Sequence, residues 1–290
     1  MSWRIVKVAK RAKLDLKLNY LVIRAETITK IHLSEISVLI IENTAIALTA
    51  ALLVELTKNN IKVIFCDEKR NPCFENIAYY GSHDTSLKIK EQIAWEKISK
   101  EKVWTKIVEN KILQQQKVLQ AHCKEEHLLL AEYIDNLEHN DITNREGHAA
   151  KVYFNALFGK NFSRQNTDVT NAALNYGYAI LLSAFNREVV SHGYLTQLGI
   201  FHDNRFNMFN FGSDIMEPFR PLVDNYVYNM ELHEFTTKEK AKLTNILNHE
   251  VKINNRKEYV NNAIGIYTNS VITALNKCDP SLIKFYENEL

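Results

Sequence analysis

Residues 201–221 gather the side chains that binding a divalent ion and a phosphodiester requires. Within these 21 residues lie one imidazole, three carboxylates and two guanidiniums, from His202, Asp203, Asp214, Glu217, Arg205 and Arg220. Aromatic residues lie between them, so part of the stretch is expected to be buried. A buried carboxylate needs a metal ion, an arginine or backbone amides as its partner. The stretch therefore predicts either a metal site or a network of ion pairs.

A further carboxylate, Glu146, lies 56 residues before His202. It follows the polar turn 140–144 and is expected to open a helix, with its side chain in the first turn near the positive helix end. Asp214 and Glu217 are three residues apart, so they would share one face of a helix that Ser213 could cap. Oxygen-rich ligands with one imidazole suit Mg²⁺ or Mn²⁺ better than zinc.

Each candidate also has a purely structural interpretation. His202 could be a hydrogen-bonded core histidine, and Glu146 could be an ordinary carboxylate at a helix N-terminus. The acids of the later stretch could instead form ion pairs within it, which would join Asp214 and Glu217 to Arg205 and Arg220. Residue spacing does not decide between these alternatives.

The elements that must position these residues fall into two parts. Strand patterns and one apolar run lie in the first 78 residues, at 3–8, 13–18, 20–24, 27–33, 37–41 and 61–66. Asn43 or Thr44 is expected to cap a helix that ends near residue 57. Helical patterns follow, at 88–139, 146–158, 171–193, 214–230, 236–250 and 256–276. The first of these is too long for one ordinary helix, so two or more are expected.

Because the strands come first and the helices second, the sequence predicts an α+β protein rather than a βαβ sheet. The expected domains are an N-terminal β-rich, sandwich-like domain at 1–78, a linker at 79–86 and a larger all-helical domain at 87–290. The candidate site residues all lie in the helical domain.

Composition excludes several classes of protein. No run approaches the roughly 20 apolar residues that a membrane helix needs, and no apolar signal-peptide core opens the chain, so a cytoplasmic protein without membrane association is expected. The cysteines lack the CxxC spacing typical of zinc sites. Net charge is only +2, but residues 1–30 hold eight basic groups against Asp15 and Glu26. This segment could face phosphates or could be an ordinary solvated edge.

Several separated motifs carry a family resemblance. They are Asn144-Arg145-Glu146-Gly147-His148-Ala149-Ala150, Tyr153-Phe154, Leu157-Phe158-Gly159, Asn175-Tyr176-Gly177-Tyr178 and Ser213-Asp214-Ile215-Met216-Glu217-Pro218-Phe219-Arg220-Pro221. Together they resemble the CRISPR adaptation integrase, the metal-dependent nuclease and integrase subunit that captures new spacers. Two more motifs are similar to its type II branch, namely Phe65-Cys66-Asp67 and Tyr80-Gly81-Ser82-His83-Asp84-Thr85-Ser86.

This resemblance implies an N-terminal β domain and a C-terminal helical domain, and it implies roles for particular residues. The metal ligands of the family, which are also its catalytic residues, match Glu146, His202 and Glu217. Many relatives have aspartate at the last of these positions. Other family positions near the metal or the phosphate match Asp214, Arg205, Arg220 and Tyr176, the last as an aromatic residue that lines the site.

The implied reaction is spacer acquisition in antiviral defence. The 3′-hydroxyl of a short DNA duplex, the prespacer, would attack a phosphodiester of the CRISPR repeat in a transesterification that requires Mg²⁺ or Mn²⁺. The resemblance implies a homodimer that works with a small second adaptation subunit. In the type II branch the effector nuclease and an accessory adaptation protein also take part.

Two other functions are compatible with the same residues. One is a metal-dependent nuclease for branched DNA, which would use the same site. The other is a catalytically silent DNA-binding scaffold. The first structural requirement for either enzyme is that Glu146, His202 and Glu217 converge.

Overall fold

The computed structural model describes residues 4–79 and 82–288, which form two compact units. The first unit contains the described residues up to Thr85 together with Val190–Gly193, and the second contains Ser86–Val189 and the described residues from Tyr194 onward. The first is rich in strands and the second is mostly helical, which confirms the predicted fold class. The linker expected at 79–86 includes residues 80 and 81, which lie outside the described residues.

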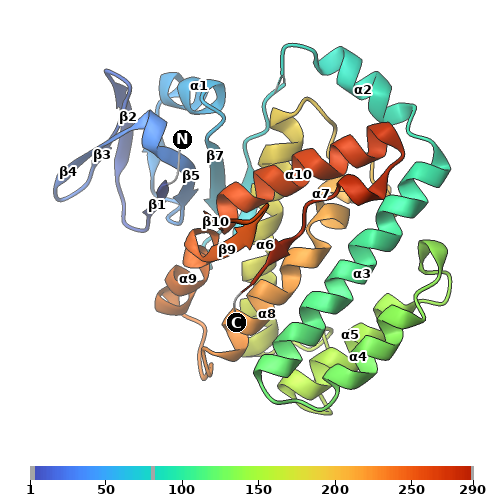
Figure 1. Cartoon of the computed structure of the whole chain (residues 1–290). Helices are drawn as coiled ribbons and strands as arrows, with labels where there is room; N and C mark the ends of the chain where they lie inside the picture. Colours follow the sequence, from blue (N-terminus) through green and yellow to red (C-terminus); the bar gives the residue numbers. More distant parts are fainter. Residues whose placement is uncertain (1–3, 80–81, 289–290) are drawn as a thin grey trace. The chain divides into compact units, whose positions relative to one another are not determined.

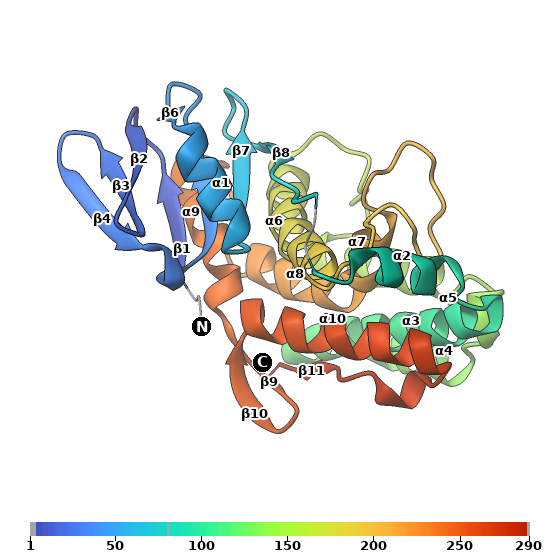
Figure 2. The same ribbon diagram turned by 90° about the horizontal axis from the view of Figure 1, so that it is seen from above.

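The first unit contains two four-stranded sheets, ordered β1-β5-β7-β8 and β4-β3-β2-β6 (Figure 2). Its elements are β1 (Arg4–Val8), β2 (Lys13–Lys17), β3 (Tyr20–Arg24), β4 (Ile28–His32), η1 (Leu33–Glu35), β5 (Ile36–Ile41), β6 (Ala47–Leu48), α1 (Ala50–Lys58), β7 (Lys62–Cys66) and β8 (Pro72–Glu75). Apolar side chains of both sheets and of α1 share one core. The apolar strand β5 is buried along its length because it lies between β1 and β7, in parallel with both.

The helix of this unit begins later than the sequence predicts. Asn43 or Thr44 was expected to cap it, but α1 begins at Ala50, and the hydroxyl of Thr49 caps it by accepting from the backbone N–H of Leu52. The Asn43 side chain instead accepts from the N–H of Ala45 in a turn. Asparagine favours such local turns as strongly as it favours helix caps, so the capping prediction was wrong.

The second unit is built mainly of helices (Figure 1). They are α2 (Thr85–Ile93), α3 (Lys97–Ala121), α4 (His127–Asp135), η2 (His139–Asp141), α5 (Arg145–Phe158), α6 (Val169–Ser191), α7 (Asn210–Ile215), η3 (Glu217–Phe219), α8 (Arg220–Tyr228), α9 (Thr237–Thr244), η4 (Asn245–Asn248), α10 (Val260–Lys277) and η5 (Pro280–Leu282). Three short strands accompany them: β9 (Glu250–Ile253), β10 (Arg256–Tyr259) and β11 (Tyr286–Glu287). As predicted, the stretch 88–139 is divided among more than one helix.

The long helix α3 is the platform of this unit. It packs against α4, α5, α8, α10 and η3, and its middle carries polar residues that are nevertheless buried, namely Asn110, Lys111, Gln114 and Gln115. The Gln114 side chain donates to the carbonyl of Tyr286 in β11, and the Tyr286 hydroxyl in turn donates to the carbonyl of Pro218 in η3, at 3.0 Å. The last described strand therefore ties η3 to α3.

One predicted helix of this unit is interrupted, and a hairpin lies at the boundary between two others. The stretch 214–230 is divided into α7, η3 and α8, with Pro218 and Pro221 in the first turns of the last two. Proline is tolerated only where a helix starts. The stretch 250–259 is a hairpin, because Asn254 and Asn255 both adopt positive φ angles, as a type I′ turn requires. The second domain is therefore not wholly helical.

No helix among residues 4–79 and 82–288 is long and apolar enough to cross a membrane.

Helices α6 and α8 approach closely at Gly177, where a Cβ atom would lie 2.5 Å from a methyl group of Val223. We expect Gly177→Ala to destabilise the protein by about 1–3 kcal/mol, the usual range for overpacking. In a Val223→Ala background the same change should be neutral or stabilising, because the clash is gone and alanine favours a helix. Urea unfolding of the four proteins measures the coupling. A cost that persists in the Val223→Ala background would contradict the prediction.

Candidate active site

Glu146 lies in the first turn of α5, as predicted. Two side chains cap this helix: the Asn144 carboxamide accepts from the N–H of Gly147, and the Asp141 carboxylate accepts from the N–H groups of Arg145 and Glu146. Asp141 thus fixes the backbone from which the Glu146 side chain projects. This carboxylate is one quarter exposed.

Glu217 begins η3 and is almost fully buried. Its Oε1 accepts from Nε of Arg220 at 2.8 Å, and its Oε2 lies 2.5 Å from Nζ of Lys111. Burial opposes ionisation of this carboxyl group, but the charges of Arg220 and Lys111 outweigh it and lower the pKa of Glu217 to about 2. Glu217 is therefore an anion at neutral pH.

Lys111 joins the two glutamates. Its Nζ also lies 2.5 Å from Oε1 of Glu146, so carboxylates from α5 and η3 meet at one ammonium group carried by α3. Burial acts to lower the pKa of Lys111, but the charges of Glu217 and Glu146 raise it above its usual value. Three elements that are distant in the sequence thus converge on one point.

His202 lies in the segment before α7 and is held by Asp214. The fully buried Asp214 carboxylate accepts from the backbone N–H groups of Ile200, Phe201 and His202, and its Oδ1 lies 2.5 Å from Nδ1 of the imidazole. Since Asp214 is an acceptor, Nδ1 carries the proton, and in the neutral ring Nε2 has the free lone pair. A carboxylate behind a histidine in this way is typical of metal-binding histidines.

The backbone before His202 approaches Asp214 very closely. A Cβ atom at Gly199 would lie 2.3 Å from the carbonyl oxygen of His202 and 2.7 Å from the Asp214 carboxylate. Only glycine fits there without a shift of the loop. The next ring along the chain, that of Phe201, stacks on Trp104 of α3, and the His202 ring meets the same indole edge-on.

These positions correct one prediction. Asp214 and Glu217 were expected to share one helical face capped by Ser213, but Asp214 lies in α7 and Glu217 opens η3, and Ser213 lies inside α7. The alternative in which these acids form ion pairs within the stretch holds in part. Glu217 pairs with Arg220, whereas Asp214 accepts from backbone amides and from His202.

The other predicted residues have surroundings of their own. Arg205 is exposed and its guanidinium lies 4.7 Å from the centre of the Phe206 ring, and Asp203 is exposed nearby. The buried Tyr176 ring meets Phe235 edge-on. The structure does not test the proposed roles of Arg205 and Tyr176, which stay predictions.

The fit of these residues to a divalent ion can be examined directly. As they stand, no three His, Cys, Asp or Glu side chains in the described part of the chain lie close enough together to hold a metal. The oxygens of Glu146 and Glu217 are nevertheless at most about 5 Å apart, since each lies 2.5 Å from the same nitrogen. Opposite oxygen ligands of Mg²⁺ are about 4.2 Å apart. Two carboxylates and an imidazole with a free Nε2 fit Mg²⁺ or Mn²⁺ in donor type.

Sequence reasoning missed the contribution of α3. Trp104 and Lys111 are seven residues apart and therefore lie on the same face of the helix, two turns from each other. Ile107 and Val108 between them are fully buried. A lysine on the apolar face of a helix is a signal that could have identified Lys111, because a buried ammonium needs an acidic partner.

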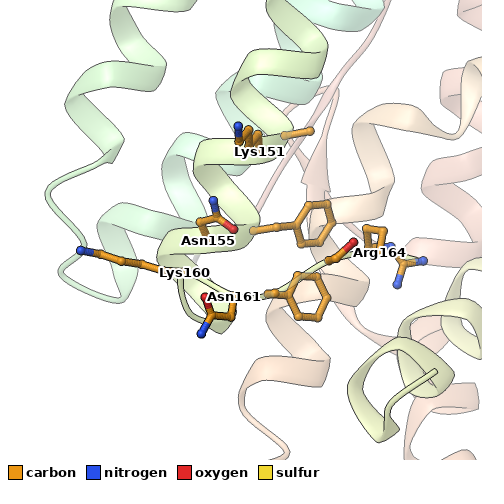
Figure 3. Close-up of a pocket in the computed structure, with 9 residues that line it drawn as sticks. Lys151, Asn155, Lys160, Asn161 and Arg164 are labelled. Atoms are coloured by element: carbon orange, nitrogen blue, oxygen red, sulfur yellow. The ribbon is translucent and has the colours of Figure 1, made fainter. Parts of the chain in front are cut away.

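A second feature that the sequence did not reveal is a basic cavity of about 410 Å³ beside the second half of α5. Lys151 and Asn155 of α5 and Lys160, Asn161 and Arg164 of the following segment line it (Figure 3). Phe154 and Phe162 also contribute to the lining. Lys151 is five residues, about 7.5 Å, along α5 from Glu146.

The basic residues of the first 30 positions are largely paired. Five ion pairs join them to carboxylates: Arg4 with Glu35, Lys7 with Glu42, Lys10 with Glu26, and both Lys13 and Arg24 with Asp15. Such pairing is typical of a solvated protein surface. It favours the second of the two interpretations of this segment.

Comparison with known proteins identifies the family. Residues 6–261 match the family model described as CRISPR associated protein Cas1. The CRISPR-associated endonuclease Cas1 of Neisseria meningitidis serogroup C (strain 8013) is 36% identical over 236 residues, which are 79% of this chain and 76% of that protein. The chain therefore belongs to the Cas1 family, as its motifs predicted.

Solved structures share the fold. A casposase bound to integration product has a TM-score of 0.77 at 18% identity. The similarity covers 96% of this chain and 91% of the casposase chain. A Cas1 protein from Thermotoga maritima has a TM-score of 0.75 at 17% identity, with coverage of 94% and 97%. A chain of a Cas6-RT-Cas1–Cas2 complex has a TM-score of 0.73 at 17% identity, and this protein covers 36% of that longer chain.

The bond between His202 and Asp214 leads to a test by titration. This bond raises the pKa of the His202 imidazole above its usual value, and the charges of Glu217 and Glu146 add to the effect. In Asp214→Asn, without metal, the pKa of His202 should fall, which NMR titration of the ring protons measures.

The raised pKa also means that the bond favours folding below the pKa of a free imidazole and that this contribution is lost as pH rises through the folded-state value. An unchanged pKa would contradict this account.

Proposed function

We propose that this protein is a metal-dependent DNA endonuclease and integrase of CRISPR adaptation, which joins prespacer 3′-hydroxyl ends to the CRISPR repeat by transesterification. The observation that carries the proposal is the convergence of Glu146 and Glu217 on one cation position, with His202 near enough for their charges to raise its pKa. The names of the relatives support it, since the Neisseria protein is called an endonuclease and the casposase is bound to an integration product.

The chain's own residues would divide the work as follows. Glu146, Glu217 and Nε2 of His202 would hold the ion, and Asp214 would keep the imidazole oriented and its Nδ1 protonated. A bound Mg²⁺ or Mn²⁺ would neutralise phosphate charge and polarise the bond that breaks. Two negative carboxylates at the site would otherwise repel a phosphodiester, so positive charge is needed there before DNA can bind.

Arg220 is suited to hold the phosphate. Its Nε donates to Glu217, which fixes the orientation of the guanidinium at the edge of the site. The guanidinium carbon lies 4.6 Å from the centre of the Tyr178 ring. A fixed guanidinium can donate to phosphate oxygens through its remaining N–H groups. Arg205, in the exposed segment after His202, would contact the DNA backbone at the mouth of the site.

The basic cavity beside α5 provides a further contact for DNA. Lys151, Lys160 and Arg164 can neutralise backbone phosphates, while the rings of Phe154 and Phe162 pack against each other in the wall of the cavity. Helix α5 links this cavity to Glu146. We therefore propose that DNA passes along α5 to reach the site.

The partners follow from the family. We propose that the protein acts as a homodimer with a small second adaptation subunit, and the solved complexes of Cas1 with Cas2 support such a partner. Participation of a type II effector nuclease and of an accessory adaptation protein stays a prediction from the motifs.

Glu217→Gln tests the site with little change in shape. We expect joining of a labelled prespacer to a repeat-containing plasmid to fall at least about 100-fold, because one ligand charge is lost, while duplex binding in a gel-shift assay is retained. Asp203→Asn is the matched control, an exposed acid of the same stretch, and should join at the wild-type rate. Normal joining by Glu217→Gln would refute the site assignment.

The competing functions separate in the same assay with wild-type protein. An integrase joins prespacer ends in the presence of Mn²⁺ and the partner subunit and stops in a chelator. A nuclease for branched DNA would cleave a four-way junction yet join nothing. A silent scaffold would bind duplex DNA with neither activity.

A further inference from the structure

Lys111 occupies an unusual position for a lysine. Its ammonium lies in the interior of the helical unit, 8% of the residue is exposed, and it touches one oxygen from each of the two glutamates proposed to bind the ion. Lysines elsewhere on α3 make ordinary surface pairs, for example Lys106 with Glu109, both well exposed. The structure therefore assigns Lys111 a role that a surface ion pair does not have.

The two carboxylates cannot remain as they are without a cation between them. Glu217 is 4% exposed and Glu146 faces it across the Lys111 nitrogen. Two anions at most about 5 Å apart in a poorly solvated place repel each other strongly. Arg220 neutralises only the other oxygen of Glu217. A cation between them is thus required for the two carboxylates to stay this close together.

We propose that Lys111 is an internal counter-ion, which occupies the place of the divalent ion in the metal-free protein and leaves it when the ion binds. This inference rests on the proposed metal site. It explains how the glutamates of α5 and η3 keep their convergence before metal arrives. It also implies that metal affinity is limited by competition with the protein's own ammonium group.

The two cations of the site differ in their freedom to move. Arg220 is fixed by its bond to Glu217 and by the Tyr178 ring against its guanidinium. Lys111 has a four-carbon stem with rotatable bonds and a small charged head, so it can withdraw its ammonium by rotation about its side-chain bonds while α3 stays in place. An ammonium and a divalent cation cannot share the same pair of oxygens, because their charges repel at such short range.

The test is equilibrium binding of Mn²⁺ to the intact protein by isothermal titration calorimetry. In Lys111→Met, which keeps the apolar stem and removes the charge, the Kd for Mn²⁺ should fall at least about tenfold because no internal cation competes. Lys111→Arg keeps a cation and should not bind more tightly than wild type. Lys106→Met, the matched change on the surface of the same helix, should bind like wild type.

Thermal unfolding gives an independent reading. In chelator, Lys111→Met should melt below wild type, and saturating Mn²⁺ should raise its Tm more than it raises that of wild type. If the variant does not fold in chelator, its refolding is followed by circular dichroism with and without Mn²⁺. Refolding only with Mn²⁺ supports the proposal that Lys111 and the ion replace each other. Failure to refold in both conditions overturns that proposal.

The remaining outcomes separate this inference from the proposed function. Mn²⁺ binding that Glu217→Gln abolishes, with equal or weaker affinity in Lys111→Met, overturns the role of Lys111 and leaves the metal site standing. Absence of binding to wild type and to Lys111→Met overturns both. Binding to Lys111→Met but not to wild type supports the inference in its strongest form.

Discussion

The cost of burying negative charge governs the architecture around this site. Glu217, Asp214 and Asp224 are each at most 4% exposed, and each is compensated in a different way. Glu217 has two cations, Asp214 has three backbone amides and an imidazole, and Asp224 has the hydroxyl of Tyr178. Burial raises the pKa of Asp224 to about 6 even though that hydroxyl opposes the rise, whereas cations keep Glu217 ionised. The direct ion pairs of Glu217 thus hold its pKa well below that of Asp224, for which burial outweighs the hydroxyls of Tyr178 and Tyr153 and the charges of Arg220 and Arg164.

Helix α3 supplies the frame on which these compensations depend. Its Trp104 supports the segment that carries His202, and its Lys111 meets the glutamates of α5 and η3. A straight helix of 25 residues fixes the spacing of these two side chains. The site is therefore formed by the segment that carries His202, the start of α5 and the start of η3, all of which contact α3. Precision of this kind is what positioning a phosphodiester requires.

How much of this could be read from the sequence depends on whether the signal was local. Strand alternation at 13–18 and 20–24 and the helix start at Glu146 were predictable, because propensity and caps act over a few residues. The interruption before Arg220 was signalled by Pro218 and Pro221, which the helical pattern outweighed. The meeting of Lys111 with Glu146 and Glu217 was not predictable from spacing, since it joins residues up to 106 positions apart and exists only when the helices have packed. Family motifs predicted Glu146 and Glu217 as ligands without indicating that Lys111 lies between them.

The tie between η3 and the strand β11 has a consequence for how the protein is made. Glu217 and Pro218 lie in η3, and the hydroxyl that holds η3 from behind belongs to Tyr286, almost seventy residues later. A ribosome-bound chain that has reached α8 already contains every acid of the site but lacks this support. The hydrogen bond from Tyr286 to η3 can therefore form only after β11 has been synthesised, so the backbone around Glu217 gains this support late.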